Sequence, residues 1–242
     1  MQDDSAKFRF SRRGAIGLGV SAVTTGLIGS ATSSAVASPL PGSVDPAAAW
    51  RRLEAGNARF VEGRQRHPHE QLAWRRRLAD GQAPFACVLG CADSRVTPEL
   101  VFDHGLGDLF TVRTAGQVLD ESIIGSTEYA VEHLGVRLIV VLGHERCGAV
   151  TAAIELVRDG AALTGSVSTL VRSIEATVLS TPADTDPAAF LAACVDRQAL
   201  RVVEQLKERS RVIREAVERH GVDLVAAVYD LDEFRVSRLT PR

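Results

Sequence analysis

The sequence lacks the features that mark several specialised classes of protein. Its 242 residues carry a formal net charge of only -2, so the charge balance gives no reason to expect nucleic acid as a partner. It has no internal repeat of roughly 20 to 50 residues and no heptad run, which argues against a repeat protein or a coiled coil. With 45% hydrophobic and 24% charged residues, the composition instead suits one globular domain with a sizeable core.

Cysteine is scarce. The four cysteines are irregularly spaced, and the chain is long enough to fold without disulfide bonds, so a disulfide framework is not expected. Cys87 lies inside an apolar run, about 13 Å along an extended chain from Cys91. We predict that Cys87 and Cys194 are small core residues. Cys91 and Cys147 remain as candidates for chemistry.

A long apolar run is also missing. The Gly- and Ala-rich stretch 14–28 is too short and too interrupted to span a bilayer. It follows Arg12 and Arg13, and residues 35–37 supply a small-residue cleavage pattern. We therefore predict a twin-arginine export signal over residues 1–37, whose removal releases an extracytoplasmic or secreted protein with no membrane attachment. Export in the folded state would let a metal be loaded beforehand in the cytoplasm.

The remaining chain predicts an α/β fold. After a linker over 38–44, we expect a single domain over 45–242 that begins with an N-terminal helical arm. Near-continuous apolar runs predict strands buried on both faces, as in a parallel sheet: 85–89, 109–112, 137–142 and 223–229. Residues 234–239 alternate like an edge strand. Helical patterns lie at 70–79, 98–102, 122–134, 147–157 and 187–219. The expected architecture is a central, mostly parallel sheet of four strands plus an edge strand, flanked by helices.

Candidate metal ligands follow two of the predicted strands. Cys91 comes just after the first strand, and His144 and Cys147 come just after the third. Because ligands collect at the carboxyl ends of parallel strands, we expect these three side chains to meet at one edge of the sheet if the two strands are neighbours. Two thiolates and one imidazole favour zinc, and three protein ligands leave an open position, as in catalytic zinc sites.

A charged pair adjoins the first of these ligands. Asp93 lies two residues after Cys91, and Arg95 lies two residues further on. A planar guanidinium that binds this carboxylate through two hydrogen bonds would keep Asp93 ionised and oriented beside the open position. A surface ion pair of little energetic consequence is the alternative, and the position next to a candidate ligand favours the functional interpretation.

Two motifs carry a resemblance to a known family. CADSRV at 91–96 and HERCG at 144–148 resemble the β-class carbonic anhydrases, and the similarity extends over most of the chain after the predicted signal. Further stretches that support it lie at 56–61, 98–99, 107–110, 112–116 and 126–131. The resemblance implies one zinc ion per subunit, held by Cys91, His144 and Cys147, with Asp93 and Arg95 as a catalytic pair.

The resemblance also implies a substrate pocket and a homodimer or tetramer. Gln82, Phe110, Tyr129 and Gly148 would line a small pocket for CO2 or bicarbonate, where Gln82 donates a hydrogen bond to bicarbonate and Tyr129 is a candidate for proton transfer. In the family the N-terminal helix wraps the partner subunit, and the pocket lies at the subunit interface. Ordinary packing is the alternative for the three larger side chains.

The implied activity is reversible hydration of CO2 to bicarbonate and a proton, by attack of a zinc-bound hydroxide. Two alternatives stay open: a related zinc hydrolase of carbonyl sulfide or carbon disulfide, and a non-catalytic zinc or thiol sensor. His67, His69 and His104 could each carry the released proton, and spacing does not choose among them.

Two positions depart from common family patterns. Gln117 stands where the family commonly has Asn, and Val88 stands where members with a non-catalytic bicarbonate pocket have Trp. Inhibition of that kind is therefore not expected.

Overall fold

The computed structural model describes residues 44–240, so the predicted export signal and the linker up to residue 43 lie outside the described residues. A five-stranded sheet with the order β2-β1-β3-β4-β5 forms the centre. Its strands are β1 (Ala86–Gly90), β2 (Leu109–Arg113), β3 (Leu138–His144), β4 (Asp223–Tyr229) and β5 (Val236–Arg238). The first four run parallel, and β5 pairs antiparallel with β4 at the edge. The predicted α/β architecture is confirmed.

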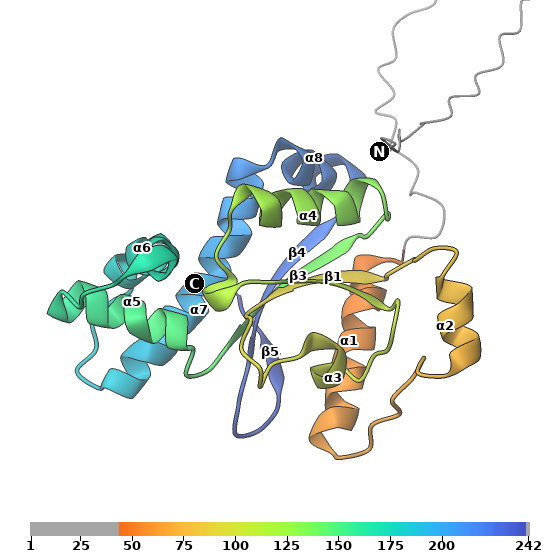
Figure 1. Ribbon diagram of the computed structural model, residues 1–242, viewed down its shortest axis with the longest axis horizontal. Coiled ribbons are helices and arrows are strands. Elements are labelled where there is room, and N and C mark those ends of the chain that lie inside the picture. Colours follow the sequence, from red (N-terminus) through yellow and green to blue (C-terminus); the bar gives the residue numbers. More distant parts are fainter. Residues whose placement is uncertain (1–43, 241–242) are drawn as a thin grey trace, which may run out of the picture. The chain divides into compact units, whose positions relative to one another are not determined.

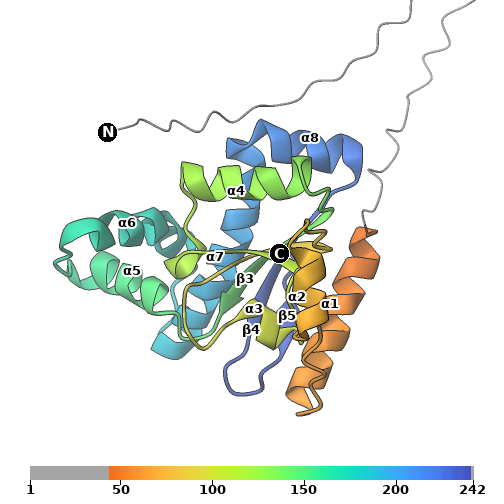
Figure 2. The ribbon, with the colours of Figure 1, turned by 45° about the vertical axis from the view of Figure 1, so that its right-hand side comes forward.

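Helices cover both faces of this sheet, which explains why its central strands are continuously apolar. Every residue of β1 and β3 is buried. Helices α1 (Pro46–Val61) and α3 (Pro98–Val101) cover one face. Helices α4 (Glu121–Glu132), α7 (Pro187–Arg209) and α8 (Arg211–His220) cover the other, and Figures 1 and 2 show the two layers on opposite sides of the strands. A short helix, α2 (Leu72–Leu78), follows α1.

A third hydrophobic cluster lies beside the sheet, where α5 (Gly148–Asp159) and α6 (Gly165–Ser180) pack against the first half of α7. In Figure 1 these two helices lie together at the left of the sheet. Helix α6 lies in a Thr- and Ser-rich region between the helical patterns 147–157 and 187–219, where the sequence analysis predicted no helix. Val171, Ile174 and Val178 recur at helical spacing and are buried, and this apolar stripe outweighs the modest helix propensity of Ser and Thr.

The helical pattern predicted over 187–219 is helical in the structure, but it is divided into two helices, α7 and α8. The break falls at Ser210, whose backbone is extended (φ -110°, ψ 114°). Its hydroxyl oxygen accepts a hydrogen bond from the Ile213 amide, so Ser210 ends α7 and is the N-cap of α8. Helix α8 ends at Gly221, which takes the left-handed conformation (φ 65°) that favours glycine at the end of a helix.

Residues in the stretch 56–61 connect α1 to α3 and to the segment around β5. A Cβ atom at position 56 would lie only 1.7 Å from the carbonyl oxygen of Phe102, so the contact between α1 and α3 requires glycine. The amide nitrogen of Asn57 donates to the carbonyl oxygens of Val101 and Phe234, and its oxygen accepts from the Val236 amide. This stretch, which contributed to the family resemblance, therefore connects α1 with the edge strand.

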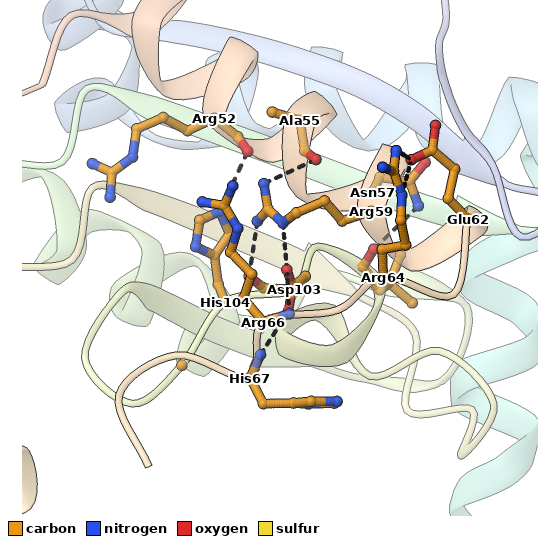
Figure 3. A network of polar contacts seen from close by, with 12 residues as sticks. Arg52, Ala55, Asn57, Arg59, Glu62, Arg64, Arg66, His67, Asp103 and His104 are labelled. Atoms are coloured by element: carbon orange, nitrogen blue, oxygen red, sulfur yellow. Dashed lines mark hydrogen bonds and ion pairs between the residues drawn. The ribbon is translucent and has the colours of Figure 1, made fainter. Parts of the chain in front are cut away.

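Asp103 anchors the segment between α1 and α2, as Figure 3 shows. Its carboxylate, 1% exposed, binds the Arg59 guanidinium at 2.5 Å and accepts hydrogen bonds from the backbone amides of Arg66 and His67.

Among the described residues, no helix is both long and apolar enough to cross a membrane.

Candidate metal centre

Three predicted ligands meet where two neighbouring strands end. Strands β1 and β3 pair in parallel, with Gly90 opposite Leu142, so the residues that follow them emerge at the same edge. Cys91 follows β1, His144 is the last residue of β3, and Cys147 is the N-cap of α5. All three are buried, and their ligand atoms lie within 4.8 Å of one another. The predicted grouping is confirmed.

The imidazole of His144 is prepared to bind a metal through one defined nitrogen. Its Nδ1 lies 2.8 Å from the carbonyl oxygen of Glu145. A carbonyl can only accept, so Nδ1 carries the hydrogen and Nε2 presents its lone pair in the neutral ring. Nε2 is buried and has no hydrogen-bond partner. A buried, unpaired nitrogen beside two sulfur atoms fits a metal ligand.

The two thiols of the group influence each other's ionisation. A hydrogen bond from Cys147 lowers the pKa of Cys91 strongly, against the effect of burial, and a bond from the Gly116 amide contributes in the same direction. The same pairing, together with burial, raises the pKa of Cys147. These hydrogen bonds thus favour the thiolate form of Cys91, which is the form that binds zinc.

Asp93 and Arg95 form the pair that the sequence predicts. Nε and Nη2 of Arg95 donate to Oδ1 and Oδ2 of Asp93 at 2.9 and 2.7 Å, and the Arg95 amide donates to Oδ1 at 2.9 Å. The side-chain hydrogen bonds hold the pKa of Asp93 well below its usual range, despite opposing desolvation. Oδ2 lies 3.8 Å from Nε2 of His144, so the carboxylate borders the metal centre.

Arg113 supports the same loop, and the sequence interpretation assigned it no role. It is the last residue of β2, next to β1. Its Nε and Nη2 donate to the carbonyl oxygens of Cys91 and Asp93 at 2.8 and 2.7 Å. Two bonds from one guanidinium fix the turn that carries both a ligand and the carboxylate. Two features of the sequence could have pointed to it: its position one residue beyond an apolar run, and its place in the stretch 112–116 that supports the family resemblance.

The predicted pocket residues are less closely grouped around the centre. Phe110 on β2 and Tyr129 on α4 lie near each other, with ring centroids 6.2 Å apart, and Tyr129 is 46% exposed. Gly148 opens α5 directly after Cys147, and apart from its chain neighbours and its own helix backbone no described atom lies within 4 Å of the place where a Cβ would lie. Gln82 is exposed between α2 and β1, and it makes no hydrogen bond within residues 44–240. Of the four predicted pocket residues, the structure thus brings together Phe110 and Tyr129.

The other predicted residues have structural surroundings. Cys87 and Cys194 are fully buried in the core, as predicted, and burial raises the pKa of Cys87 to about 12. His69 and His104 both face Asp108, at 2.9 and 3.5 Å, whereas His67 is exposed. The three histidines thus surround the segments next to α2 and α3, and none lies within the ligand group.

Gln117, the departure from the common family pattern, ends the short 3-10 helix η1 (Ala115–Gln117). It is 2% exposed and holds a left-handed backbone (φ 53°) that Asn adopts more readily than Gln. Its Oε1 is buried and has no hydrogen-bond partner.

Comparisons with known proteins agree on one family. A family model described as carbonic anhydrase matches residues 86–236. The chain is 44% identical over 193 residues to carbonic anhydrase 2 of Mycobacterium tuberculosis, covering 80% of this chain and 92% of that one. It is 42% identical over 195 residues to a carbonic anhydrase of Mycolicibacterium smegmatis, covering 79% and 92%.

Solved structures show the same fold. A Coccomyxa β-carbonic anhydrase, solved with acetazolamide, has a TM-score of 0.60 and 26% identity, covering 68% of this chain and 75% of that one. A structure from a study of two tetrameric β-carbonic anhydrases of Sordaria macrospora has a TM-score of 0.62 at 24% identity, covering 78% and 95%.

Proposed function

This chain belongs to the β-class carbonic anhydrases, and on that premise we propose that it hydrates CO2 reversibly to bicarbonate and a proton at a zinc ion held by Cys91, His144 and Cys147. The observation that carries the proposal is the donor set: a buried, unpaired Nε2 of His144 within 4.8 Å of two cysteine sulfurs. Two thiolates and an imidazole are ligands that zinc prefers.

When bound, zinc would supply a Lewis acid that lowers the pKa of a coordinated water and makes hydroxide available near neutral pH. The chain's own residues orient the reactants. An ionised carboxylate offers about four acceptor positions, two on each oxygen. Arg95 occupies both positions on Oδ1 of Asp93 and one on Oδ2.

The remaining acceptor of Asp93 is thus on Oδ2, the oxygen that lies 3.8 Å from Nε2 of His144. We assign to it the hydrogen bond that orients the attacking water. Asp93 is ionised at neutral pH, with a pKa that Arg95 lowers further, so this acceptor is present throughout the neutral range. Arg95 thereby also keeps the carboxylate from turning onto the metal.

The substrate would lie between this carboxylate and the residues next to Cys147. Gly148 leaves open space at the start of α5, and Phe110 with Tyr129 would supply an apolar wall and a hydroxyl. Tyr129 and Gln82 are exposed in the single chain, so we propose that a second subunit completes the pocket in a homodimer or tetramer.

The test is a CO2 hydration assay on the zinc-loaded protein between pH 6 and 9, beside Asp93→Asn and Cys147→Ala. We expect the wild type to bind one zinc ion per subunit and to catalyse hydration. Asp93→Asn should keep the zinc and lose most of the activity, because an amide cannot replace the ionised acceptor. Cys147→Ala should lose zinc, since it removes one of three ligands.

Two results would overturn these assignments. A zinc-loaded wild type without hydration activity, even at alkaline pH, would exclude the proposed reaction and leave the sensor alternative. Full zinc content in Cys147→Ala would exclude Cys147 as a ligand. Turnover of carbonyl sulfide or carbon disulfide in the absence of CO2 hydration would favour the related hydrolase.

We also propose that residues 45–242 act as a single catalytic domain and that the chain is exported through the twin-arginine route. Arg12 and Arg13, which precede a weakly apolar stretch, support this export route. The intact mass of protein recovered outside the cytoplasm should correspond to a chain that begins at Ser38. Retention of the complete chain in the cytoplasm would contradict the export proposal.

A further inference from the structure

A strained turn touches one of the proposed zinc ligands. The amide of Gly116 in η1 donates to Sγ of Cys91 at 3.3 Å. Gly116 and Gln117 both have positive φ, 66° and 53°. A side chain at position 116 would lie 2.7 Å from Ile174 and 3.0 Å from Ala149. The left-handed conformation of Gln117 is unfavourable for a residue other than glycine, so surrounding contacts must hold this turn.

Gln198 supplies such a contact from the middle of α7. Its Nε2 donates to the carbonyl oxygen of Gly116 at 3.0 Å, and its Oε1 accepts from the Thr177 hydroxyl at 2.6 Å. The carbonyl of Gly116 can only accept, so the nitrogen of the amide must face the turn. Gln198 is 3% exposed and Thr177 is fully buried, so neither bond is exchanged easily with water.

The connection therefore runs through buried atoms only, from Thr177 on α6 through Gln198 on α7 to Gly116 and the sulfur of Cys91. The cluster of buried side chains that contains Cys91 and Cys147 also contains Ile174 and Val195, which lie one turn from Thr177 and Gln198. An apolar side chain at position 198 would suit this surrounding, whereas a buried amide is costly unless both ends are bonded. Both polar atoms of the Gln198 amide form hydrogen bonds, and its Nε2 binds the turn next to the metal centre.

We propose that Gln198 is a positioning residue for the metal centre: it fixes the Gly116 turn so that the backbone amide stays aimed at the Cys91 sulfur. The inference rests on the proposed zinc site and deepens it. An amide that donates to a ligating thiolate orients the sulfur and moderates the charge that it gives to the metal. Gln198 touches neither metal nor substrate, so its effect must be measured at the metal.

The experiment compares Gln198→Met and Gln198→Glu with the wild type in the complete protein. Both variants keep the length of the side chain and remove the amide donor. Zinc affinity is measured by competition with a chromophoric chelator, and the cobalt-substituted proteins are compared by their thiolate-to-cobalt charge-transfer absorption. Each variant should bind zinc on the order of 10- to 100-fold more weakly, with a shifted charge-transfer band.

Thr181→Val is the matched control. Its hydroxyl donates to the Thr177 carbonyl at 2.8 Å, at similar depth, but it has no bond to Gly116. This variant should lower the melting temperature of the metal-free protein without changing zinc affinity or the cobalt spectrum. If both Gln198 variants also keep the wild-type zinc affinity and spectrum, the residue serves packing alone and the inference is overturned. A wild type that takes up no zinc would instead refute the proposed function itself.

Discussion

The pair of Asp93 and Arg95 shows how much a single side chain contributes at this centre. Arg95 is largely exposed, yet it makes three hydrogen bonds to one carboxylate, one of them from its backbone. An exposed ion pair adds little to stability. Its contribution here is to orientation, because only one acceptor position of Asp93 remains and that position faces the ligands.

Replacing Arg95 by Gln should therefore lower the rate of CO2 hydration on the order of 10- to 100-fold. Loss of the guanidinium raises the pKa of Asp93 toward its ordinary value of about 3.9, still far below neutral, so Asp93 keeps its charge. The loss should consequently be the same at pH 7 and pH 8 in a stopped-flow assay. Arg146→Gln, a change in a neighbouring arginine that binds Asp232 instead, should leave the rate close to the wild type. A rate at pH 7 that does not change in the Arg95 variant would contradict the role given to this residue.

At this scale the sequence predicts the ligands well and their supports poorly. Cys91, His144 and Cys147 carry chemistry that few other residues can supply, and their positions after two strands are visible in the pattern. Arg113 and Gln198 act on backbone carbonyls, and a carbonyl is present at every position. Such contacts depend on how strands and helices pack, so the spacing of residues in the sequence does not predict them.

Glycines inside helices illustrate how elements fit together. Gly56 lies in α1 against the backbone of Phe102, and Gly125 lies in α4 with open space around it. Gly56→Ala should lower the free energy of unfolding by about 3 kcal/mol or more, because α1 must move away from α3. Gly125→Ala should raise it by about 0.5 to 1 kcal/mol, since alanine favours a helix more than glycine does.

Chemical denaturation followed by circular dichroism measures both changes. The two variants make the same substitution inside a helix, at a buried position in α1 and at an exposed position in α4, so each is the control for the other. Equal effects of the two substitutions would mean that α1 does not pack on α3 as described.

The sequence predicts strands and helix ends better than helix interruptions. The strands were predictable because a continuous apolar run of that length fits a sheet covered on both faces. The apolar stripe of helix α6 contains only three buried apolar residues, and the Ser and Thr residues around them give the segment a composition that is typical of a loop. The break at Ser210 depends on one hydroxyl that caps α8, and a serine between two charged helical segments is also compatible with a continuous helix.

At the scale of the whole molecule, acid stability should depend on Asp103, which joins α1, α3 and the segment before α2. Burial alone would raise the pKa of this carboxyl, but the bonds from Arg59, His67 and Arg66 outweigh it and lower the pKa below its usual value. A carboxylate of this kind adds stability above its unfolded pKa, about 3.9, and the contribution is lost as the pH falls through the lower folded value.

Asp103→Asn should therefore reduce the free energy of unfolding by about 2 kcal/mol at pH 7, with the difference from wild type shrinking below about pH 4. Urea titrations from pH 7 to pH 3 measure this trend. Asp232→Asn, a change in an exposed ion pair, should remain close to the wild type at every pH. A difference for Asp103→Asn that stays constant into acid would show that its charge is not the cause.

The two cysteines of the metal centre have a further consequence if the chain is exported as we propose. Their sulfurs lie within 4.8 Å of each other, and neither is engaged in a disulfide bond. Outside the cytoplasm, thiols this close are exposed to oxidants that join sulfur atoms, and a bridge between them would remove both from metal binding. A metal held between them occupies the same lone pairs and protects them. Activity therefore depends on whether the metal binds before or after export. The ion must bind before the chain enters the oxidising compartment. A metal-free chain that is exported can form the disulfide bond, and metal supplied later would then find no thiolates to bind.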